Sequence, residues 1–199
     1  EIKDSGMARP PAFERQAALE QAMQVFWTKG YAATRVADLT AAMKLSKSSL
    51  YGAFGDKHAV FLEAIEFYRD HVTARVRSAI NLPTPARQVI RSILGRAVDR
   101  ILEPDGRRGC FLNNSAVEVG PDDPAAAERC RSGLLLMEDT FERLVRRAQA
   151  EGDIAAEHDP RKLARLLNGT VNGIMVIGKA NPDYQTLKDI VDAVMKAMD

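Results

Sequence analysis

Residues 47–51, KSSLY, gather an amine, two hydroxyls and a phenol within one short segment. Leu50 and Phe54 lie four positions apart, so a helix here turns both of them inward and the polar groups outward. Gly52 adds a position without a side chain, where a partner can approach the backbone closely. Such a surface suits hydrogen bonds to phosphates and base edges in a DNA groove. The chemistry predicted for this segment is therefore noncovalent reading of nucleic acid.

Two further helices are expected to hold this segment in place. Apolar residues recur at spacings of three and four from Val36 to Met43, which predicts a short helix there. Thr34 is positioned to cap the first free amides of that helix, and Ser46 those of the next helix, over residues 47–54. A longer amphipathic helix over residues 13–29 would pack on both. This order predicts a three-helix unit that contains a helix-turn-helix.

Three runs within this unit carry a family resemblance: GYxxT from Gly30, VxDL from Val36 and LSKxSLYxxFxxK from Leu45. On these residues the chain is similar, from Phe13 to about Ile65, to the N-terminal domain of TetR-family transcriptional regulators. The runs cover both short helices and the turn between them, so the resemblance is specific.

The resemblance implies roles for single residues of the unit. Residues matching Thr34, Tyr51 and Lys57 would contact phosphates, and those matching Lys47 and Ser49 would lie near the groove. Together, the residue pattern and the resemblance predict a DNA-contacting set of Thr34, Arg35, Lys47, Ser48, Ser49, Tyr51, Gly52 and Lys57.

Two departures from the family pattern bear on this prediction. Lys44 stands in the turn where the family usually places Gly, so it must either adopt a left-handed conformation, at roughly 1 kcal/mol, or turn differently. Ser48, Gly52 and Ala53 occupy positions where the family often carries other groups, so the operator sequence of a relative does not transfer. A plain helical hairpin with a solvated Lys and Ser surface is the alternative for this region.

The sequence after Lys57 predicts a succession of helices. Gly and Pro fall mostly at junctions, and no alternating stretch is long enough to indicate a sheet. The predicted fold is all-α, with an N-terminal three-helix helix-turn-helix DNA-binding domain over residues 7–57. A larger C-terminal helical domain follows over residues 58–199, which the resemblance assigns to effector binding and dimerisation. Residues 1–6 lack periodicity and are expected to be a tag remnant, with Met7 as the natural start.

Two apolar stripes mark the last two helices. Each needs cover on more than one side, and the resemblance implies that they pair with their copies in a four-helix dimer seam. Two recognition helices would then read half-sites about one helical turn apart, so the predicted operator is pseudo-palindromic. A core within one chain is the alternative for both stripes. The predicted interface comprises Leu163, Leu167, Val171, Ile174, Leu187, Ile190, Val191, Val194 and Met198.

The resemblance also implies an inducer pocket among the C-terminal helices. Aromatic and amide side chains beside apolar stripes are candidates, because such groups orient a ligand in a mostly apolar cavity. Core packing or surface exposure is the simpler explanation for each of them. The candidates are Phe67, His71, Phe111, Asn114, Phe141, Asn168 and Asn172.

Cys110 follows Arg107 and Arg108 at a predicted helix start, where cations and helix amides favour the thiolate. The segment GCFLxNxA from Gly109 is similar to one in a TetR subset, some of whose members sense electrophiles or oxidants through that cysteine. We therefore hypothesise such sensing at Cys110, with a plain buried cysteine as the alternative. Cys130, within a mixed helix, is expected to be inert.

Composition and motifs argue against several other classes. The 199 residues are 46% apolar with a net charge of +1, which fits a globular chain and neither a disordered nor a collagen-like one. No apolar run approaches the about 20 residues that span a bilayer, and a cytoplasmic protein without a membrane partner is expected. The chain carries no phosphate-binding loop, paired metal-spaced His residues or nucleophile elbow, so no enzyme activity, cofactor or metal is expected.

The predicted function is that of a dimeric repressor, which occupies a double-stranded DNA operator until a small-molecule or electrophile effector releases it. The alternative from another class is a helical ligand-binding or scaffold protein that has lost sequence-specific DNA binding. Lys44, Ser48 and Gly52 are the residues that favour this alternative. The salt dependence of binding distinguishes the two hypotheses. Phosphate contacts weaken steeply as ionic strength rises, whereas binding in an apolar pocket hardly responds.

Overall fold

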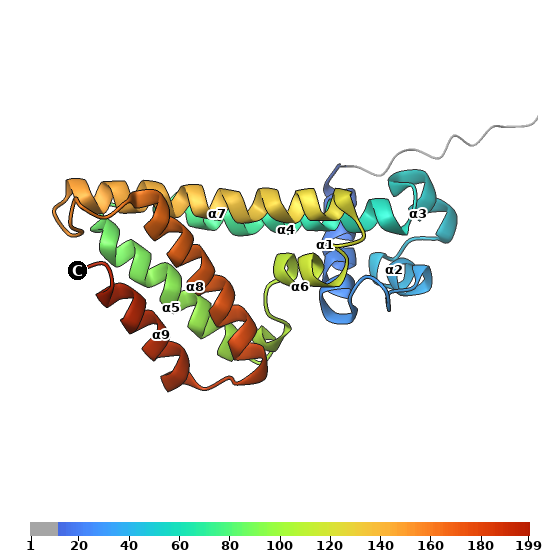
Figure 1. The fold of residues 1–199 in the computed structure, drawn as a ribbon. Coiled ribbons are helices and arrows are strands. Elements are labelled where there is room, and N and C mark those ends of the chain that lie inside the picture. The colour runs from blue at the N-terminus through green and yellow to red at the C-terminus, as the bar shows by residue number, and fades with distance from the viewer. Residues whose placement is uncertain (1–11) are drawn as a thin grey trace, which may run out of the picture. The chain divides into compact units, whose positions relative to one another are not determined.

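The computed structural model describes residues 12–199, with side chains from Arg15 onward, and all regular structure in that range is helical (Figure 1). The predicted all-α fold class is confirmed. The predicted tag remnant over residues 1–6 and the predicted start at Met7 lie outside the described residues. The elements are α1 (Ala12–Lys29), α2 (Val36–Met43), α3 (Lys47–Phe54), α4 (Lys57–Ala79), α5 (Ala86–Leu102), the short 3-10 helix η1 (Gly106–Arg108), α6 (Phe111–Glu118), α7 (Pro124–Ala150), α8 (Pro160–Ala180) and α9 (Tyr184–Lys196).

The chain divides into two compact units between Phe67 and Tyr68. Helix α4 is continuous across this division, so its first turns belong to the N-terminal unit and its later turns to the C-terminal unit. The functional boundary placed by the sequence after Lys57 stays a prediction.

Helices α2 and α3 begin and end where the sequence predicts. Ser46 caps α3 as expected, because its hydroxyl accepts a hydrogen bond from the Ser49 amide at 3.0 Å. The turn before it contains Lys44 in the left-handed conformation, with φ 54° and ψ 39°. The chain therefore keeps the turn geometry of a helix-turn-helix with Lys in place of Gly.

The cap predicted for α2 is wrong. Arg35 holds the N-cap position, and its amide donates to Asp38 Oδ2 at 2.9 Å. The Thr34 side chain is buried, and its hydroxyl donates instead to the carbonyl of Gly30 at 2.6 Å. That carbonyl follows the end of α1, where backbone acceptors lack helical partners. Thr34 thus closes the loop between α1 and α2.

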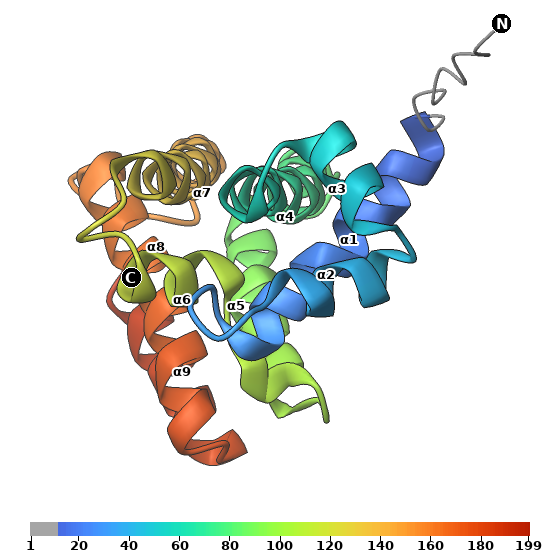
Figure 2. The ribbon, with the colours of Figure 1, turned by 90° about the vertical axis from the view of Figure 1, so that its right-hand side faces the viewer.

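An aromatic pair forms the centre of the N-terminal unit. Phe26 of α1 and Phe61 of α4 pack edge to face with ring centroids 5.1 Å apart. Leu39 of α2 and Leu50 of α3 are fully buried in the same unit. Each of the four helices contributes a side chain to this core, and Figure 2 shows α1, α2 and α3 around the first turns of α4. The apolar residues of the two short helices thus fix which of their faces remain outside.

The core of the C-terminal unit lies among α5, α7, α8 and α9, of which α5, α8 and α9 run side by side in Figure 1. Gly178 lets α8 approach α5 closely, since an added Cβ there would lie 2.5 Å from Ile101 Cγ1. Tight packing of this kind leaves little free volume, and a β-branched neighbour has few rotamers with which to make room.

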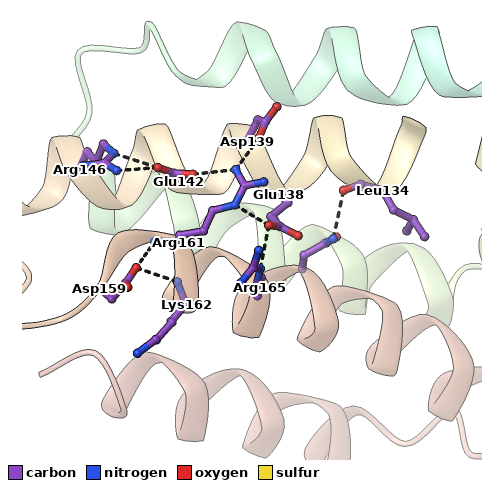
Figure 3. Close-up of polar contacts among 10 residues, drawn as sticks. Leu134, Glu138, Asp139, Glu142, Arg146, Asp159, Arg161, Lys162 and Arg165 are labelled. Carbon is purple, nitrogen blue, oxygen red and sulfur yellow. Dashed lines mark hydrogen bonds and ion pairs between the residues drawn. The ribbon is translucent and has the colours of Figure 1, made fainter. Parts of the chain in front are cut away.

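An ion-pair network joins the start of α8 to the middle of α7 (Figure 3). Arg161 contacts Glu138 at 2.7 Å, Asp139 at 2.6 Å and Glu142 at 2.7 Å, and Arg165 adds a second contact to Glu138 at 3.1 Å. The hydrogen bond from Arg161 is the main cause that holds the pKa of Glu142 below its usual range. The network sets the position of α8 along α7.

The dimer interface predicted from the two apolar stripes needs correction. Most of its residues are buried within their own chain, and Val171 and Ile190 are partly buried against the same core. Apolar periodicity indicates that a face is covered but does not indicate by what. Helix α8 packs on α5, α7 and α9, and α9 packs on α5 and α8, so the buried residues of both stripes belong to the core of one chain. The buried residues are Leu163, Leu167, Ile174, Leu187, Val191, Val194 and Met198.

Candidate nucleic-acid interface

The outer face of α3 carries the polar groups that the sequence placed there. Lys47, Ser48, Tyr51 and Gly52 are all exposed, and Tyr51 keeps 40% of its surface accessible. The Lys47 ammonium lies 5.9 Å from the centroid of the Tyr51 ring, within cation–π range. An amine, a hydroxyl and a phenol thus share one surface with a stretch of uncovered backbone.

Three other predicted contact residues differ in where they lie. Arg35 is exposed at the start of α2. Ser49 is half-buried, and its hydroxyl lies 2.8 Å from that of the capping Ser46. Thr34 keeps only 1% of its surface accessible. The structure therefore places Thr34 in the support of the interface and not on its surface.

Lys57 also acts inside the unit. Its ammonium donates to the carbonyls of Tyr31 at 2.7 Å and Thr34 at 2.8 Å, and it lies 4.3 Å from the Tyr31 ring centroid. Both carbonyls belong to the loop between α1 and α2, whereas Lys57 begins α4. In this geometry its charge holds two segments together, and its predicted phosphate contact stays a prediction.

Further cations of the unit pair with carboxylates. Arg15 of α1 contacts Glu63 of α4 at 2.8 Å, and Lys29 contacts Asp38 at 2.7 Å. The hydrogen bond from Lys29, followed by that from the Arg35 amide, keeps the pKa of Asp38 below its ordinary value. Part of the positive charge near α3 is therefore used to hold the helices together.

The aromatic effector candidates differ in how far they are buried. Phe111 and Phe141 keep 2% and 0% of their surface accessible, and Phe141 belongs to the core of the C-terminal unit. His71 is exposed on α4, and the half-buried Phe67 is the last residue of the N-terminal unit. Phe141 is thus part of the core and Phe111 packs edge to face on Tyr68, while an effector role for any of the four stays a prediction.

The amide candidates form hydrogen bonds within the C-terminal unit, two of them between elements and one within α8. Asn114 donates to the Arg108 carbonyl at 2.7 Å and accepts from Lys179 at 3.1 Å. Asn168 donates to the Leu134 carbonyl at 3.1 Å, and Asn172 donates to Asn168 at 3.4 Å. Each amide therefore has a structural function independent of any ligand.

Cys110 has neighbours that sequence reasoning missed. The Tyr68 hydroxyl of α4 donates to Cys110 Sγ at 3.7 Å, and Arg100 of α5 donates to that hydroxyl at 3.5 Å. Tyr68 is 4% exposed, and burial raises its pKa above the usual range, so the phenol keeps its proton. Tyr68 and Cys110 are 42 residues apart, and no local signal in the sequence connects them.

Residues 12–199 contain no group of three or more His, Cys, Asp or Glu side chains placed to hold a metal ion. None of the helices in that range is both long and apolar enough to cross a membrane.

Comparison with known families agrees with the geometry of both units. Residues 18–64 match the family model described as bacterial regulatory proteins, tetR family, and residues 86–194 match that of the tetracyclin repressor-like C-terminal domain. The chain belongs to the TetR family. The first model covers most of α1, all of α2 and α3 and the first turns of α4, and the second runs from the start of α5 into α9.

Relatives of this TetR-family chain span nearly its whole length. It is 30% identical to YezE of Bacillus subtilis, an uncharacterised HTH-type transcriptional regulator, over 97% of this chain and 100% of the relative. It is 26% identical to the repressor ComR of Escherichia coli, over 94% of this chain and 90% of that one. A solved structure of a cysteine mutant of the TetR-family regulator CifR, complexed with a 26-bp operator DNA, is similar to this chain with a TM-score of 0.84 and 31% identity. The match covers 96% of this chain and 100% of the CifR chain.

We expect the substitution Lys57→Met to lower the free energy of unfolding by about 1–3 kcal/mol, because it leaves two loop carbonyls without their charged donor. The matched substitution Lys47→Met removes an exposed amine and should change it by less than about 0.5 kcal/mol. Urea unfolding of both variants measures the difference. Equal effects would contradict the supporting role of Lys57.

Proposed function

We propose that this TetR-family protein is a ligand-responsive transcriptional repressor whose α3 reads a pseudo-palindromic DNA operator. The observation that carries the proposal is the exposed face of α3, where Lys47, Ser48, Tyr51 and Gly52 lie on a helix fixed from behind. The CifR complex with operator DNA supports it, as do the relatives named as repressors, ComR and DhaR. The proposed activity is DNA binding without catalysis. We propose that it takes place in the cytoplasm, where bacterial DNA lies.

The domain roles follow from the same proposal. Residues 7–57 would bind DNA, and residues 58–199 would hold the effector and the dimer contacts. Helix α4 is continuous from one unit into the other, so a displacement of this helix would be transmitted to both units. An effector releases DNA only if it binds one arrangement of the recognition helices more tightly than the other.

The operator is tested by selecting bound sequences from a random duplex pool at two salt concentrations. The parent should enrich a palindrome, and the double variant Lys47→Ala, Tyr51→Ala should not, because it removes the amine and the phenol of the reading face. A control with Arg96→Ala and Leu82→Ala, both exposed in the C-terminal unit, should enrich the same palindrome. No enrichment by the parent at low salt would instead favour a helical ligand-binding or scaffold protein.

The proposed dimer needs a surface, and the outer face of α8 offers one. Leu166, Val176 and Ile177 expose 46%, 58% and 40% of their surfaces, and they recur at helical spacing on the side away from the core. Gly169 and Gly173 lie between them with no atom within 4 Å of an added Cβ, so a second helix has room to approach. We propose that this face, and not the buried stripes, pairs with its copy about a two-fold axis.

Replacing Leu166 and Val176 with Glu should convert the dimer into monomers, because the pairing faces would then carry four like charges. Light scattering after size-exclusion chromatography at micromolar concentration measures the mass. The matched control replaces Leu82 and Val117, which are 45% and 81% exposed elsewhere, and should stay dimeric. If the Leu166 and Val176 variant stayed dimeric, as the control does, this interface would be ruled out.

A second proposal concerns the effector and rests on the Tyr68–Cys110 hydrogen bond. The Tyr68 hydroxyl donates a hydrogen bond to Cys110 Sγ at 3.7 Å, and this contact orients the sulfur for attack on an electrophilic carbon. We propose that electrophiles release the operator by alkylating Cys110. Cys130 is an internal reference, since it is 2% exposed and burial raises its pKa to about 11, which leaves it as an unreactive thiol at neutral pH.

Iodoacetamide should label Cys110 before Cys130 in the native protein, with the new bond between sulfur and carbon displacing iodide. Tyr68→Phe should slow this labelling at pH 7 severalfold, because it removes the hydrogen bond to sulfur. Mass spectrometry of the digested protein gives both rates. Labelling of Cys130 alone would rule out sensing at Cys110.

A further inference from the structure

Few polar contacts hold α3 to the other helices of its unit. Its N-terminal end is tied to its own turn through the cap Ser46. Among residues 15–199, whose side chains the structure describes, the one hydrogen bond between α3 and another helix runs from Arg15 of α1 to the Ala53 carbonyl. The inner face of α3 is buried, but apolar burial has no directional preference. The orientation of the outer face therefore depends on what holds the C-terminal end of this helix.

The Arg15 guanidinium contacts that end in two ways. Its Nη2 donates to the Ala53 carbonyl in a long hydrogen bond of 3.5 Å, and its central carbon lies 4.4 Å from the centroid of the Phe54 ring. Both contacts are favourable, because the C-terminal end of a helix carries partial negative charge and an aromatic face attracts a cation. One planar group thus holds the last two residues of α3.

Helix α4 fixes the same guanidinium from another side. Arg15 Nη2 also donates to Glu63 Oε1 at 2.8 Å, and it lies 2.8 Å from Oε2 of the same carboxylate. A charge-assisted hydrogen bond of this length is stronger than one between neutral groups. Glu63 thereby orients the planar group that lies over Phe54. A single side chain of α1 thus connects the end of α3 to α4.

A hollow beside this contact leaves part of α3 without close packing. It has a volume of about 680 Å³ and lies between α1, the turn and the end of α3, with Arg15, Met43, Leu45 and Phe54 among its lining residues. Closely packed side chains fix the orientation of a helix, because displacement makes atoms overlap. The hollow removes that restraint on one side. Arg15 is therefore the contact that limits the tilt of α3 toward α1.

The contact contributes more to orientation than to stability. Arg15 Nε is buried and has no hydrogen-bond acceptor among the described residues, and an unpaired buried donor costs free energy. The pair with Glu63 offsets little of this cost, since the two side chains expose 27% and 32% of their surfaces and water screens their attraction. An apolar side chain at this position would avoid the unpaired donor, but it could not bind the carbonyl and the carboxylate together.

We propose that Arg15 is a positioning residue for DNA reading, which sets the angle of α3 and so the alignment of Lys47 and Tyr51 with base edges. This inference rests on the proposed DNA-binding function. Contacts to base edges carry the sequence information through fixed hydrogen-bond geometry, whereas phosphate contacts do not select a sequence. Loss of Arg15 should therefore lower the discrimination between duplexes more than it lowers affinity for duplex DNA in general.

The test measures the affinity of the full chain for the palindrome that the parent enriches and for a scrambled duplex of equal length. Arg15→Met should lower the ratio of the two affinities by about tenfold, the size of one lost base contact. Affinity for the scrambled duplex and its salt dependence should stay parental. The urea midpoint should stay close to that of the parent, because removal of the unpaired donor offsets loss of the ion pair.

Two further variants control this result. Arg131→Met breaks an exposed ion pair with Glu128 on α7 and should keep the parental affinity ratio. Glu63→Ala should lower the ratio as Arg15→Met does, because it releases the guanidinium from α4. In the Arg15→Met background Glu63→Ala should add little, since both changes remove the same connection.

The outcomes separate this inference from the function on which it rests. A parental affinity ratio in Arg15→Met refutes the positioning role. A loss of about 0.9 per protomer from the slope of log affinity against log salt on the scrambled duplex also refutes it, because Arg15 would then contact a phosphate itself. Additive effects of Arg15→Met and Glu63→Ala refute the connection through Glu63. A parent that enriches no duplex instead refutes the DNA-binding function.

Discussion

The hydrogen bonds from Lys57 to the carbonyls of Tyr31 and Thr34 are the constraint on which the reading surface depends. A cation at the first residue of a helix is opposed by the helix dipole, so it needs compensating acceptors. The two carbonyls and the Tyr31 ring supply them. Because α3 ends at Phe54 and α4 begins at Lys57, this contact fixes the end of α3 relative to the loop between α1 and α2.

Positive charge is divided between support and recognition in the N-terminal unit. Cations at its helix junctions pair within the fold, whereas Lys44 and Lys47 have no acidic partner among the residues whose side chains the structure describes. Helix α8 shows a similar division, since one face fills the core of its own chain and the other exposes Leu166 and Val176. Arg161 and its three carboxylates hold α8 on α7, which keeps that outer face in one orientation.

Local patterns predicted the parts of this structure that local contacts determine. The bounds of α2 and α3 and the Ser46 cap follow from residues within one or two turns, and the left-handed Lys44 is one of the two turn conformations that the sequence left open. Thr34 was misassigned because its hydroxyl found a carbonyl at the end of the preceding helix. Partners of Lys57 and Cys110 lie 23 to 42 residues away, so only the fold brings them together. The buried stripes of α8 and α9 were recognised as apolar, but periodicity could not reveal which helices cover them.

The most direct test of the central claim is a structure of the full chain bound to a duplex that it selects. We expect the exposed face of α3 to lie in the major groove, with Lys47 and Tyr51 toward DNA. Lys57 should still bind the carbonyls of Tyr31 and Thr34. A complex in which α3 lies outside the groove, or in which Lys57 leaves those carbonyls for a phosphate, would contradict it.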